Sequence, residues 1–351
     1  MTKKTISGKV AWRSPSNIAL VKYWGKRPVQ LPSNPSLSMT LNRAFTEMTL
    51  EYRLKKEEDG TPLLEFLFEG HKKDKFEQKI AAYLQSLFSE FPLLKKYSYK
   101  ISSSNTFPHS TGIASSASSM SALGLCLAEM ISRLNHIPLS FRQASVLARL
   151  ASGSACRSVY GGYVIWGRIP ELEGTSDDYA IQVPFDVNKE FKDMRDAILV
   201  VSSEEKKVSS RAGHSLMENH PYATQRYEMA NSNTRDLAEA LKKGDVDRFV
   251  RITEQEALNL HALMMSSDPS FILIEPNTLN IVNTVRYFRK ETSVPVCFTL
   301  DAGPNVHMFY PGKDESLVKE WISEDLLKFC ENGNWIDDQI GSGPEKLKIE
   351  K

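Results

Sequence analysis

The sequence predicts an α+β protein with two domains, on three observations. Strand-like and helical patterns are mixed in both halves of the 351-residue chain, without the regular strand–helix alternation of a parallel α/β protein. A chain of this length exceeds the usual size of one hydrophobic core, so two domains are expected. An acidic, irregular stretch around 170–184 provides the boundary, and we predict an N-terminal domain of residues 1–184 and a C-terminal domain of residues 185–351.

The N-terminal half opens with strands and then alternates them with helices. Apolar runs predict strands at residues 8–13, 37–41, 46–54, 63–68 and 163–166. Helical periodicity predicts helices at about 76–91, 113–134 and 140–150. Ser140 and Gln143 have the spacing of a capping box, which would start the last of these helices. The strands at 46–54 and 63–68 are expected to form a hairpin across Glu57–Gly60.

The C-terminal half carries the same mixture of elements. Apolar runs predict strands at residues 196–202, 294–300 and 306–310. Helical periodicity predicts helices at about 220–242, 245–265, 277–290 and 315–331. The tail from 341 to 351 shows neither pattern, so we expect it to fray.

Composition narrows the class of function. The chain is 41% hydrophobic and 25% charged, as an ordinary globular protein is, and its net charge is +1. This balance argues against nucleic-acid and membrane partners, so any anion site must be a local pocket. The four cysteines are widely spaced and form no zinc motif, which favours a reducing compartment. Without a signal peptide or an apolar membrane span, the expected location is cytoplasmic.

The Ser-rich stretch at residues 103–119 is the feature around which the other candidates are arranged. A strand-like run leads into it and a small-residue helix leaves it, so hydroxyl residues and Gly112 stand at a strand-to-helix turn. Backbone N–H groups at such a turn can approach an anion, and the helix N-terminus favours negative charge. We interpret it as a phosphate-binding loop, although it is neither a Walker A nor a G-x-G-x-x-G sequence. A Ser-rich linker before an ordinary helix is the alternative.

A basic and aromatic cluster precedes this loop in the chain. Within residues 14–28, Lys22-Tyr23-Trp24-Gly25-Lys26 combines ammonium donors with two large rings, just after a Pro-containing turn. Aromatic rings beside lysines can form one wall of a substrate site, with the ammonium groups as donors to an anion. A solvated loop is the alternative interpretation.

Two further residues could carry chemistry. Arg157, in a Ser/Gly-rich segment, is a candidate anion clamp, because a guanidinium binds carboxylate or phosphate with two parallel hydrogen bonds. Asp301 ends an apolar strand before a Gly-Pro-Asn turn, where its carboxylate could orient or deprotonate an alcohol that attacks a phosphoryl group. The alternatives are a surface arginine at a helix end and an aspartate bonded within its own turn. Cys156 is a poor nucleophile candidate, and the seven histidines form no metal-binding pair.

Five motifs follow one another in a specific order. They are Lys22-Tyr-Trp-Gly-Lys26, Phe107-Pro-x-x-x-Gly112-Ile-Ala-Ser-Ser-Ala-Ser118, Ser152-Gly-Ser-Ala-Cys-Arg157-Ser, Ser209-Ser-Arg-Ala-Gly213 and Asp301-Ala-Gly-Pro-Asn305. In this order the chain resembles the diphosphomevalonate decarboxylase family of the GHMP kinase superfamily, over essentially residues 8–310. The resemblance implies a two-domain GHMP kinase fold with the active site in the inter-domain cleft.

The resemblance also implies a reaction. Members phosphorylate the tertiary 3-hydroxyl of mevalonate 5-diphosphate with ATP and Mg²⁺, and the intermediate then loses phosphate and carbon dioxide to give isopentenyl diphosphate, in the mevalonate pathway of isoprenoid biosynthesis. Phosphate on a tertiary carbon is a good leaving group, and the neighbouring carboxylate quenches the resulting positive charge by expelling carbon dioxide. A homodimer is expected from the habit of the family.

Position by position, the resemblance assigns roles to residues of this chain. The catalytic residues would be Asp301, Arg157, Lys22 and Asn17, with Asp301 on the 3-hydroxyl and Arg157 on the substrate carboxylate. The substrate diphosphate would be surrounded by Tyr23, Lys26, Ser152, Gly153, Ser210 and Arg211. The ATP phosphates would be bound by Pro108, His109, Ser110, Gly112, Ala114, Ser115, Ser116 and Ser118. No protein side chain is assigned as a metal ligand.

The chain departs from the family pattern at two places. Residues 107–112 read Phe-Pro-His-Ser-Thr-Gly where the family usually has Phe-Pro-Thr-Ala-Ala-Gly, which leaves the contacts of His109 and Ser110 open. Asn34-Pro35-Ser36 stands where many members have Asn-Ser-Ser, a change we expect to be minor.

Three functions are therefore weighed. The first is the full decarboxylase, and the second is a mevalonate 3-kinase or a phosphomevalonate decarboxylase on the same scaffold. The third is a non-catalytic nucleotide-binding regulator. The joint presence of Asp301, Lys22 and Arg157 disfavours the kinase and the regulator, and Tyr23 with Lys26 favours a diphosphate over a monophosphate.

Overall fold

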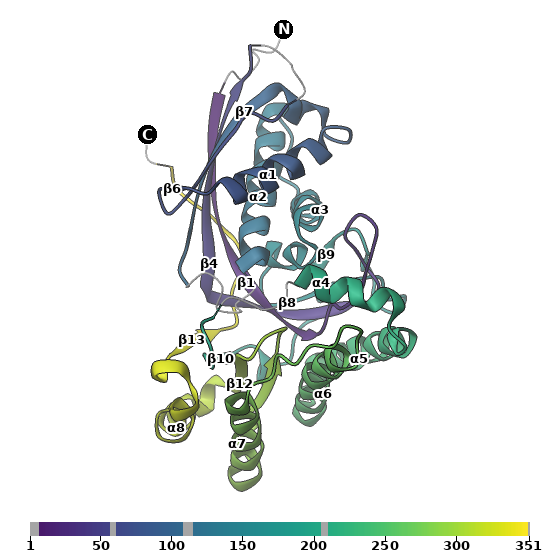
Figure 1. The fold of residues 1–351 in the computed structure, drawn as a ribbon, viewed down its shortest axis with the longest axis vertical. Helices are drawn as coiled ribbons and strands as arrows, with labels where there is room; N and C mark the ends of the chain where they lie inside the picture. Colours follow the sequence, from purple (N-terminus) through teal and green to yellow (C-terminus); the bar gives the residue numbers. More distant parts are fainter. Residues whose placement is uncertain (1–6, 57–60, 108–114, 205–209, 350–351) are drawn as a thin grey trace.

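The chain folds around two large β-sheets, which confirms the α+β class (Figure 1). The computed structural model describes residues 7–56, 61–107, 115–204 and 210–349. The larger sheet has eight strands in this part of the chain and contains β1 (Ser7–Val21), β4 (Ser36–Leu54), β5 (Leu64–Phe68), β6 (His71–Lys72), β7 (Tyr97–Asn105), β8 (Tyr163–Trp166), β9 (Ala180–Gln182) and β14 (Glu345–Lys346). Its main order is β14-β1-β4-β7-β5-β6, with β8 paired to β4 and β9 paired to β8.

Three helices cover one face of the larger sheet: α1 (Asp74–Leu87), α2 (Ser115–Asn135) and α3 (Phe141–Ala151) (Figure 1). Strand residues such as Val10, Leu50 and Ile101 alternate toward this face and bury themselves against the helices in one apolar core. The predicted start of α3 is confirmed, because the Ser140 hydroxyl accepts a hydrogen bond from the N–H of Gln143.

The smaller sheet has four strands in the described chain, in the order β11 (Cys297–Leu300), β12 (Val306–Pro311), β10 (Met194–Leu199), β13 (Trp335–Gln339). Its helices are α4 (Ser210–Ser215), α5 (Ala223–Lys243), α6 (Val246–Met265), α7 (Pro276–Thr292) and α8 (Glu315–Trp321). Successive side chains of β10 point to opposite faces of the sheet and so pack in two different cores. Ala197 and Leu199 pack in the core with α7 and α8, whereas Ile198 faces a core shared with α5, α6 and the ends of β1 and β4.

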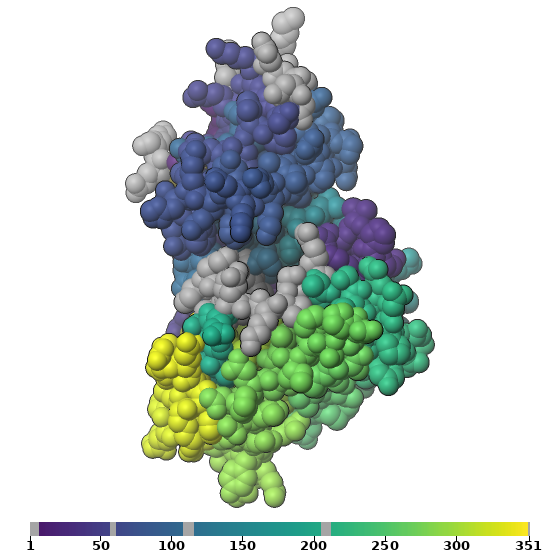
Figure 2. Space-filling model, viewed as in Figure 1, coloured from purple at the N-terminus to yellow at the C-terminus, as the bar shows by residue number. Residues whose placement is uncertain are grey.

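The shared core joins the two sheets. Ile18 and Leu20 of β1 and Met39 of β4 lie in one cluster with Ile252 of α6 and Phe309 of β12. Figure 2 shows one face of the molecule, with blue residues of the N-terminal half above and green and yellow residues of the C-terminal half below. Since β9 ends at Gln182 and β10 begins at Met194, the segment between them links the sheets, and a boundary after residue 184 stays a prediction.

Two predictions about the first strands are wrong. The strand expected at 8–13 continues to Val21, with register irregularities at Pro15/Asn17 and Ala19/Val21, so the expected loop begins only at Lys22. The strands expected at 37–41 and 46–54 are one strand, β4. A strand that is buried on both faces does not alternate between apolar and polar residues, and Ser14 to Val21 are all buried. The alternation used for the prediction therefore did not reveal this part of the strand.

The predicted hairpin between 46–54 and 63–68 is also wrong. β7 lies between these strands: it pairs antiparallel with β4, Leu50 opposite Ile101, and parallel with β5, Phe66 opposite Ile101. The turn at Glu57–Gly60 lies outside the described residues. A turn sequence indicates a reversal of the chain, but burial of the apolar rows decides which strands become neighbours.

The C-terminal end corrects two more predictions. The tail is not frayed over its described part, because Glu345 and Lys346 pair with Arg13 and Trp12 of β1. The helix expected at 315–331 ends at Trp321 and continues as a π turn at Ile322–Leu326 and a 3₁₀ turn at Leu327–Phe329. The strand β13 was not predicted. Within the described ranges, no helix is long and apolar enough to cross a membrane.

Candidate active site

Two predicted catalytic residues meet where the sheets join. Lys22 follows the last residue of β1, and Asp301 follows the last residue of β11. The Lys22 Nζ lies 3.2 Å from the Asp301 Oδ1, although the residues are 279 positions apart. The lysine side chain is only 2% exposed, whereas that of Asp301 is 29% exposed. The carboxylate is therefore the member of the pair that a ligand can reach.

The side chain of Lys22 is shielded from water and its ammonium group is bound by protein atoms. Its Nζ also donates to the carbonyl oxygen of Ala19 at 2.6 Å. Burial lowers the pKa of Lys22, and the nearby carboxylates of Asp301 and Glu256 oppose that effect, while Arg157 adds to it. A charged Lys22 at this position stabilises negative charge on or near Asp301 more strongly than it would in water.

Arg157 and Asn17 form the second part of this reacting centre. Arg157 is 3% exposed, and its guanidinium donates to Asn17 Oδ1 at 3.2 Å and to Ser36 Oγ at 2.6 Å. Asn17 in turn donates to Ser158 Oγ at 2.7 Å. Burial lowers the pKa of Arg157 and the charge of Asp301 raises it, so the two groups share one electrostatic environment. Among the described residues, Arg157 forms no ion pair, which leaves a buried cation available to an anionic ligand.

The predicted diphosphate residues Tyr23 and Gly153 also meet. A side chain at Gly153 would place its Cβ 2.8 Å from the Tyr23 hydroxyl oxygen, so only glycine admits the ring. The Tyr23 ring packs edge-on against Trp166 with centroids 4.7 Å apart. The Tyr23 hydroxyl is buried and has no partner among the described residues, and burial raises its pKa. A buried hydroxyl of this kind is suited to donate to a ligand oxygen.

Helix α4 is attached to the Lys22–Lys26 segment by His214. The Nδ1 of His214 accepts the Gly25 N–H at 3.0 Å, and its ring lies 4.2 Å from the Tyr23 ring and 5.0 Å from the Trp24 ring, between centroids. Burial, with Lys26 and Arg157 nearby, lowers the pKa of His214 to about 3, so the ring is neutral. The backbone of Ser210 and Arg211 begins this same helix, which His214 attaches to the Lys22–Lys26 segment.

The other predicted diphosphate residues lie beside this group. Lys26 opens a short hairpin of β2 (Lys26–Arg27) and β3 (Leu31–Pro32), and its Nζ donates to Gln30 Oε1 at 3.5 Å. Ser152 is the half-buried residue between α3 and the 3₁₀ turn at Gly153–Val159. Val29 and Gln30 at the hairpin tip both have φ of 59°, a left-handed conformation that is costly for a β-branched residue such as Val29.

Most of the predicted ATP loop falls outside the described residues, namely Pro108, His109, Ser110, Gly112 and Ala114. Helix α2 begins at Ser115, with no acidic residue in its first turn, and Ser116 is exposed there. Ser118 is buried, and its hydroxyl shares a 2.7 Å hydrogen bond with Thr46 Oγ1. This geometry favours Ser118 as a residue that fixes the start of α2 against β4.

Several functional candidates were missed in the sequence. Arg226 of α5 and Glu256 of α6 form a buried ion pair that contacts the backbone of Lys22, and His261 of α6 contacts the backbone of Asp301. The available signal was a charged or polar residue on the buried face of an amphipathic helix, since Glu256 lies between Ile252 and Leu260. Within the described ranges, no three His, Cys, Asp or Glu side chains are placed to hold a metal ion.

The Cys156 thiol lies near the Arg157 guanidinium but is unsuited to nucleophilic chemistry. It is fully buried, and burial raises its pKa to about 12, with Arg157 and Arg149 opposing the effect. The thiol therefore remains protonated at neutral pH.

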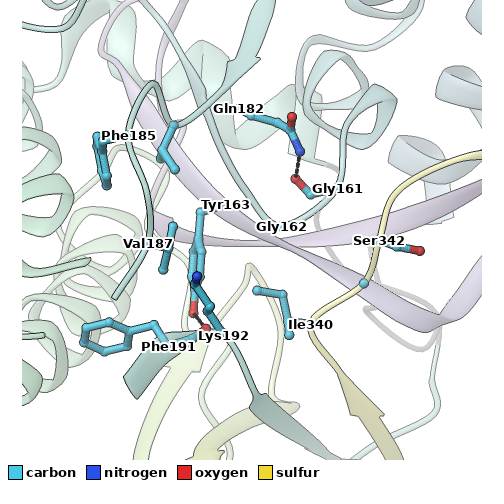
Figure 3. A pocket seen from close by; sticks show the side chains of 12 residues that line it. Gly161, Gly162, Tyr163, Gln182, Phe185, Val187, Phe191, Lys192, Ile340 and Ser342 are labelled. Atoms are coloured by element: carbon cyan, nitrogen blue, oxygen red, sulfur yellow. Dashed lines mark hydrogen bonds between the residues drawn. The ribbon is translucent and has the colours of Figure 1, made fainter. Parts of the chain in front are cut away.

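A separate cavity of about 480 Å³ lies near the segment that links the sheets (Figure 3). Two of its polar side chains already have partners, since the Tyr163 hydroxyl donates to the Phe191 carbonyl and the Gln182 amide donates to the Gly161 carbonyl. None of the predicted site residues lines it; the lining is Gly161, Gly162, Tyr163, Gln182, Val183, Phe185, Val187, Phe191, Lys192, Ile340, Gly341 and Ser342. The predicted site around Lys22 and Asp301 is therefore distinct from this cavity.

Two family models match this chain. Residues 14–180 match the diphosphomevalonate decarboxylase-like N-terminal domain, and residues 197–346 match the mevalonate 5-diphosphate decarboxylase C-terminal domain. Together the two matches include Lys22, Arg157 and Asp301.

Named relatives agree with these models. The diphosphomevalonate decarboxylase of Ganoderma lucidum is 32% identical over 345 residues, which cover 93% of this chain and 84% of the relative. The enzyme of the same name from Saccharomyces cerevisiae is 31% identical over 324 residues, which cover 88% of this chain and 79% of the relative.

Solved structures extend the similarity to the whole fold. Mevalonate diphosphate decarboxylase from Staphylococcus aureus has a TM-score of 0.82 at 29% identity, covering 98% of this chain and 99% of that one. A structure of MDDEF in complex with MVAPP, AMPPCP and magnesium also has a TM-score of 0.82 at 29% identity, covering 98% and 100%. The chain belongs to the diphosphomevalonate decarboxylase family and has its two-domain GHMP kinase fold.

Proposed function

We propose that this protein catalyses the ATP-dependent decarboxylation of mevalonate 5-diphosphate to isopentenyl diphosphate, with ADP, phosphate and carbon dioxide as the other products. The observation that carries the proposal is the buried Arg157, which has no carboxylate partner among the described residues and shares its environment with the Lys22–Asp301 pair. A kinase for an ordinary alcohol needs a carboxylate and a cation at the hydroxyl, but it needs no second buried guanidinium. A substrate carboxylate gives that guanidinium a charge partner.

Each residue of the reacting centre then has a role. Asp301 accepts a hydrogen bond or the proton from the 3-hydroxyl, and Lys22 stabilises the negative charge that develops on that oxygen. Arg157 binds the substrate carboxylate, with its guanidinium oriented by Asn17 and Ser36. Transfer of the γ-phosphoryl group to the 3-oxygen is followed by loss of phosphate. The electron pair of the bond to the carboxylate carbon forms the new double bond as carbon dioxide leaves.

The substrate diphosphate belongs on the opposite side of this centre. The Tyr23 hydroxyl, which has no partner among the described residues, lies against Gly153, and Lys26 and Ser152 are close to these two residues in the chain. Ser210 and Arg211 reach the same side through α4, which is anchored by His214. We assign these residues to the two phosphates, because several donors on short elements match the larger charge of a diphosphate.

The N-terminus of α2 fits the phosphates of ATP. Its first turn lacks a carboxylate that would compete with an anion, and the exposed Ser116 offers a hydroxyl there, with Ser115 preceding it. Bound Mg²⁺ supplies charge neutralisation at the phosphates, and it requires few protein ligands because it retains water and binds phosphate oxygens.

The decisive test is a product assay with purified protein, ATP and Mg²⁺. With mevalonate 5-diphosphate, we expect carbon dioxide, phosphate and ADP in equal amounts. ADP without carbon dioxide would identify a mevalonate 3-kinase. Turnover only with mevalonate 5-phosphate would identify a phosphomevalonate decarboxylase, and nucleotide binding without turnover would identify a regulator.

We also propose a cytoplasmic location and a homodimeric assembly. The four cysteines Cys126, Cys156, Cys297 and Cys330 are all buried free thiols, which supports a reducing compartment. The homodimer rests on the habit of the family. Cell fractionation and the mass of the protein in solution test these two statements.

A further inference from the structure

One helix, α6, contacts both members of the catalytic pair through their backbones. Glu256 of α6 accepts the N–H of Lys22 at 2.9 Å, and five residues later the Nε2 of His261 lies 3.0 Å from the carbonyl oxygen of Asp301. Lys22 and Asp301 follow strands of different sheets, so pairing within one sheet does not fix their separation. A rigid helix that contacts both segments can do so.

The contact to Lys22 is part of a buried network of hydrogen bonds. Glu256 is fully buried and forms a two-bond pair with Arg226 of α5, at 2.8 Å for each bond. Arg226 also donates to the Lys22 carbonyl at 2.8 Å, and Asn34 donates to the same oxygen at 2.9 Å. Both polar groups of the Lys22 peptide backbone are therefore held from the side of α5 and α6. Burial raises the pKa of Glu256, but Arg226 and the N–H of Lys22 outweigh it and lower that pKa overall.

The contact to Asp301 uses a neutral histidine. A carbonyl oxygen can only accept, so the Nε2 of His261 carries the proton and donates it to Asp301. His261 is 1% exposed, and burial lowers its pKa to about 4, although its bond to the Asp301 carbonyl opposes the effect. The ring therefore keeps one tautomer and one orientation at neutral pH, and it fixes the backbone that carries the catalytic carboxylate.

We propose that α6 is the common support of the catalytic pair, with His261, Glu256 and Arg226 as positioning residues that set the distance between Lys22 and Asp301. This inference rests on the proposed function, since it takes Lys22 and Asp301 as the catalytic pair. None of the three positioning side chains touches the reacting atoms. Their loss should lower kcat more than it changes KM, because a displacement of about 1 Å at reacting groups can reduce rates by about 100-fold.

The first test compares three histidine variants. His261→Leu removes the donor to Asp301, and His261→Gln restores an N–H donor at similar reach. His220→Leu is the matched control, because the buried His220 makes the same kind of bond, from its Nε2 to the Leu263 carbonyl of α6 at 3.0 Å, away from the catalytic pair. We expect kcat to fall by about 10- to 100-fold in His261→Leu with KM within about twofold, and to stay within about threefold in His261→Gln and His220→Leu.

The second test compares two arginines that pair with carboxylates of α6. Arg226→Lys keeps the charge but loses the planar fork that binds both oxygens of Glu256 as well as the Lys22 carbonyl. Arg289→Lys is the control, since Arg289 pairs with Glu254 of α6 and donates to the Val296 carbonyl instead. We expect a loss of about 10-fold or more in kcat for Arg226→Lys only, after correction for the folded fraction.

The rate to measure is ADP formation, because it depends on Asp301 whether or not carbon dioxide follows. Absence of carbon dioxide from the wild-type protein would overturn the proposed function but not the support role of α6. Wild-type ADP formation in His261→Leu, or an equal loss in His220→Leu, would overturn the support role. A crystal structure of His261→Leu gives a readout independent of activity. It should show a Lys22–Asp301 separation that differs from 3.2 Å, and an unchanged separation would overturn the inference.

Discussion

The proposed reacting centre and the proposed diphosphate side of the site are built in different ways. Lys22, Arg157 and Asn17 are almost fully buried, and protein atoms already bind their polar groups. Tyr23 and Lys26 are only half-buried, and the Tyr23 hydroxyl has no partner among the described residues. The polar groups of the first region are already oriented by protein atoms before a ligand binds. The second region contains the Tyr23 hydroxyl, to which a ligand oxygen can bind.

This difference follows from what each region has to do. Charge develops at the 3-hydroxyl during the reaction, so donors there must already be oriented if they are to lower the barrier. The diphosphate does not react, and its donors contribute binding energy that is realised when the ligand replaces water. We therefore expect substitutions in the first region to lower kcat, and substitutions in the second to raise KM.

The largest expected effect is at Asp301. Asp301→Ala should lower kcat by roughly 1,000-fold, the scale of general-base and electrostatic contributions, while the Kd for ATP changes by less than about twofold. Asp301→Asn keeps the shape but removes the charge, so it should lose nearly as much. Steady-state kinetics and nucleotide binding measure both quantities, and near-normal turnover in Asp301→Ala would falsify the assigned role.

Acid should destabilise both regions through their buried histidines. His214 on the diphosphate side and His261 at the reacting centre have pKa values of about 3 and about 4 in the folded protein, below the ordinary 6.5. Between about pH 6.5 and 4 the unfolded chain binds protons that the folded protein does not, so stability falls as the pH falls. We expect a loss of roughly 1–2 kcal/mol per histidine between pH 7 and 5.

Urea unfolding at pH 7 and pH 5 measures this loss. His214→Gln and His261→Gln should each reduce the pH dependence, because glutamine does not titrate. If neither variant reduces it, other groups cause the acid sensitivity. Comparison of the two variants shows which region contributes more to that sensitivity.

The smallest expected effect is at the Tyr23 hydroxyl. Tyr23→Phe removes a buried group that has no partner among the described residues, so the free energy of unfolding should stay the same or rise. The KM for mevalonate 5-diphosphate should increase by about 3- to 10-fold with little change in kcat, since one hydrogen bond to a charged group is lost.

Tyr83→Phe is the control for this change. The Tyr83 hydroxyl donates to the Leu147 carbonyl at 2.7 Å, so its removal should cost about 1 kcal/mol of stability and leave KM unchanged. A fall in kcat with unchanged KM in Tyr23→Phe would place Tyr23 in the reacting centre and contradict the comparison.

Local patterns in the sequence predicted most of the helices. The helices predicted at 140–150, 220–242, 245–265 and 277–290 are present with similar bounds, because their apolar faces repeat at helical spacing. The strand partners were less predictable. Neither the insertion of β7 beside β4 nor the pairing of β14 with β1 has a local signal, since both depend on which apolar rows are buried together.

The candidate site shows the same limit. Lys22, Arg157 and Asp301 were identified from residue type and motif order, and the structure brings Lys22 to Asp301 and both into the electrostatic environment of Arg157. Glu256 and His261 were not identified, because a single polar residue within an amphipathic helix resembles an ordinary core or surface position. Their importance depends on contacts to backbone atoms, which no side-chain motif records.

The sequence by itself determined the chemical inventory of this protein: the basic and aromatic segment around Lys22, the small-residue start of α2, the guanidinium of Arg157 and the carboxylate of Asp301. Only the tertiary structure decided that Lys22 and Asp301 lie 3.2 Å apart and that α6 contacts the backbone of both. The physical reason is the distance along the chain over which each kind of information acts. Residue type and spacing act over a few neighbours, whereas the core that joins the two sheets sets distances between residues hundreds of positions apart.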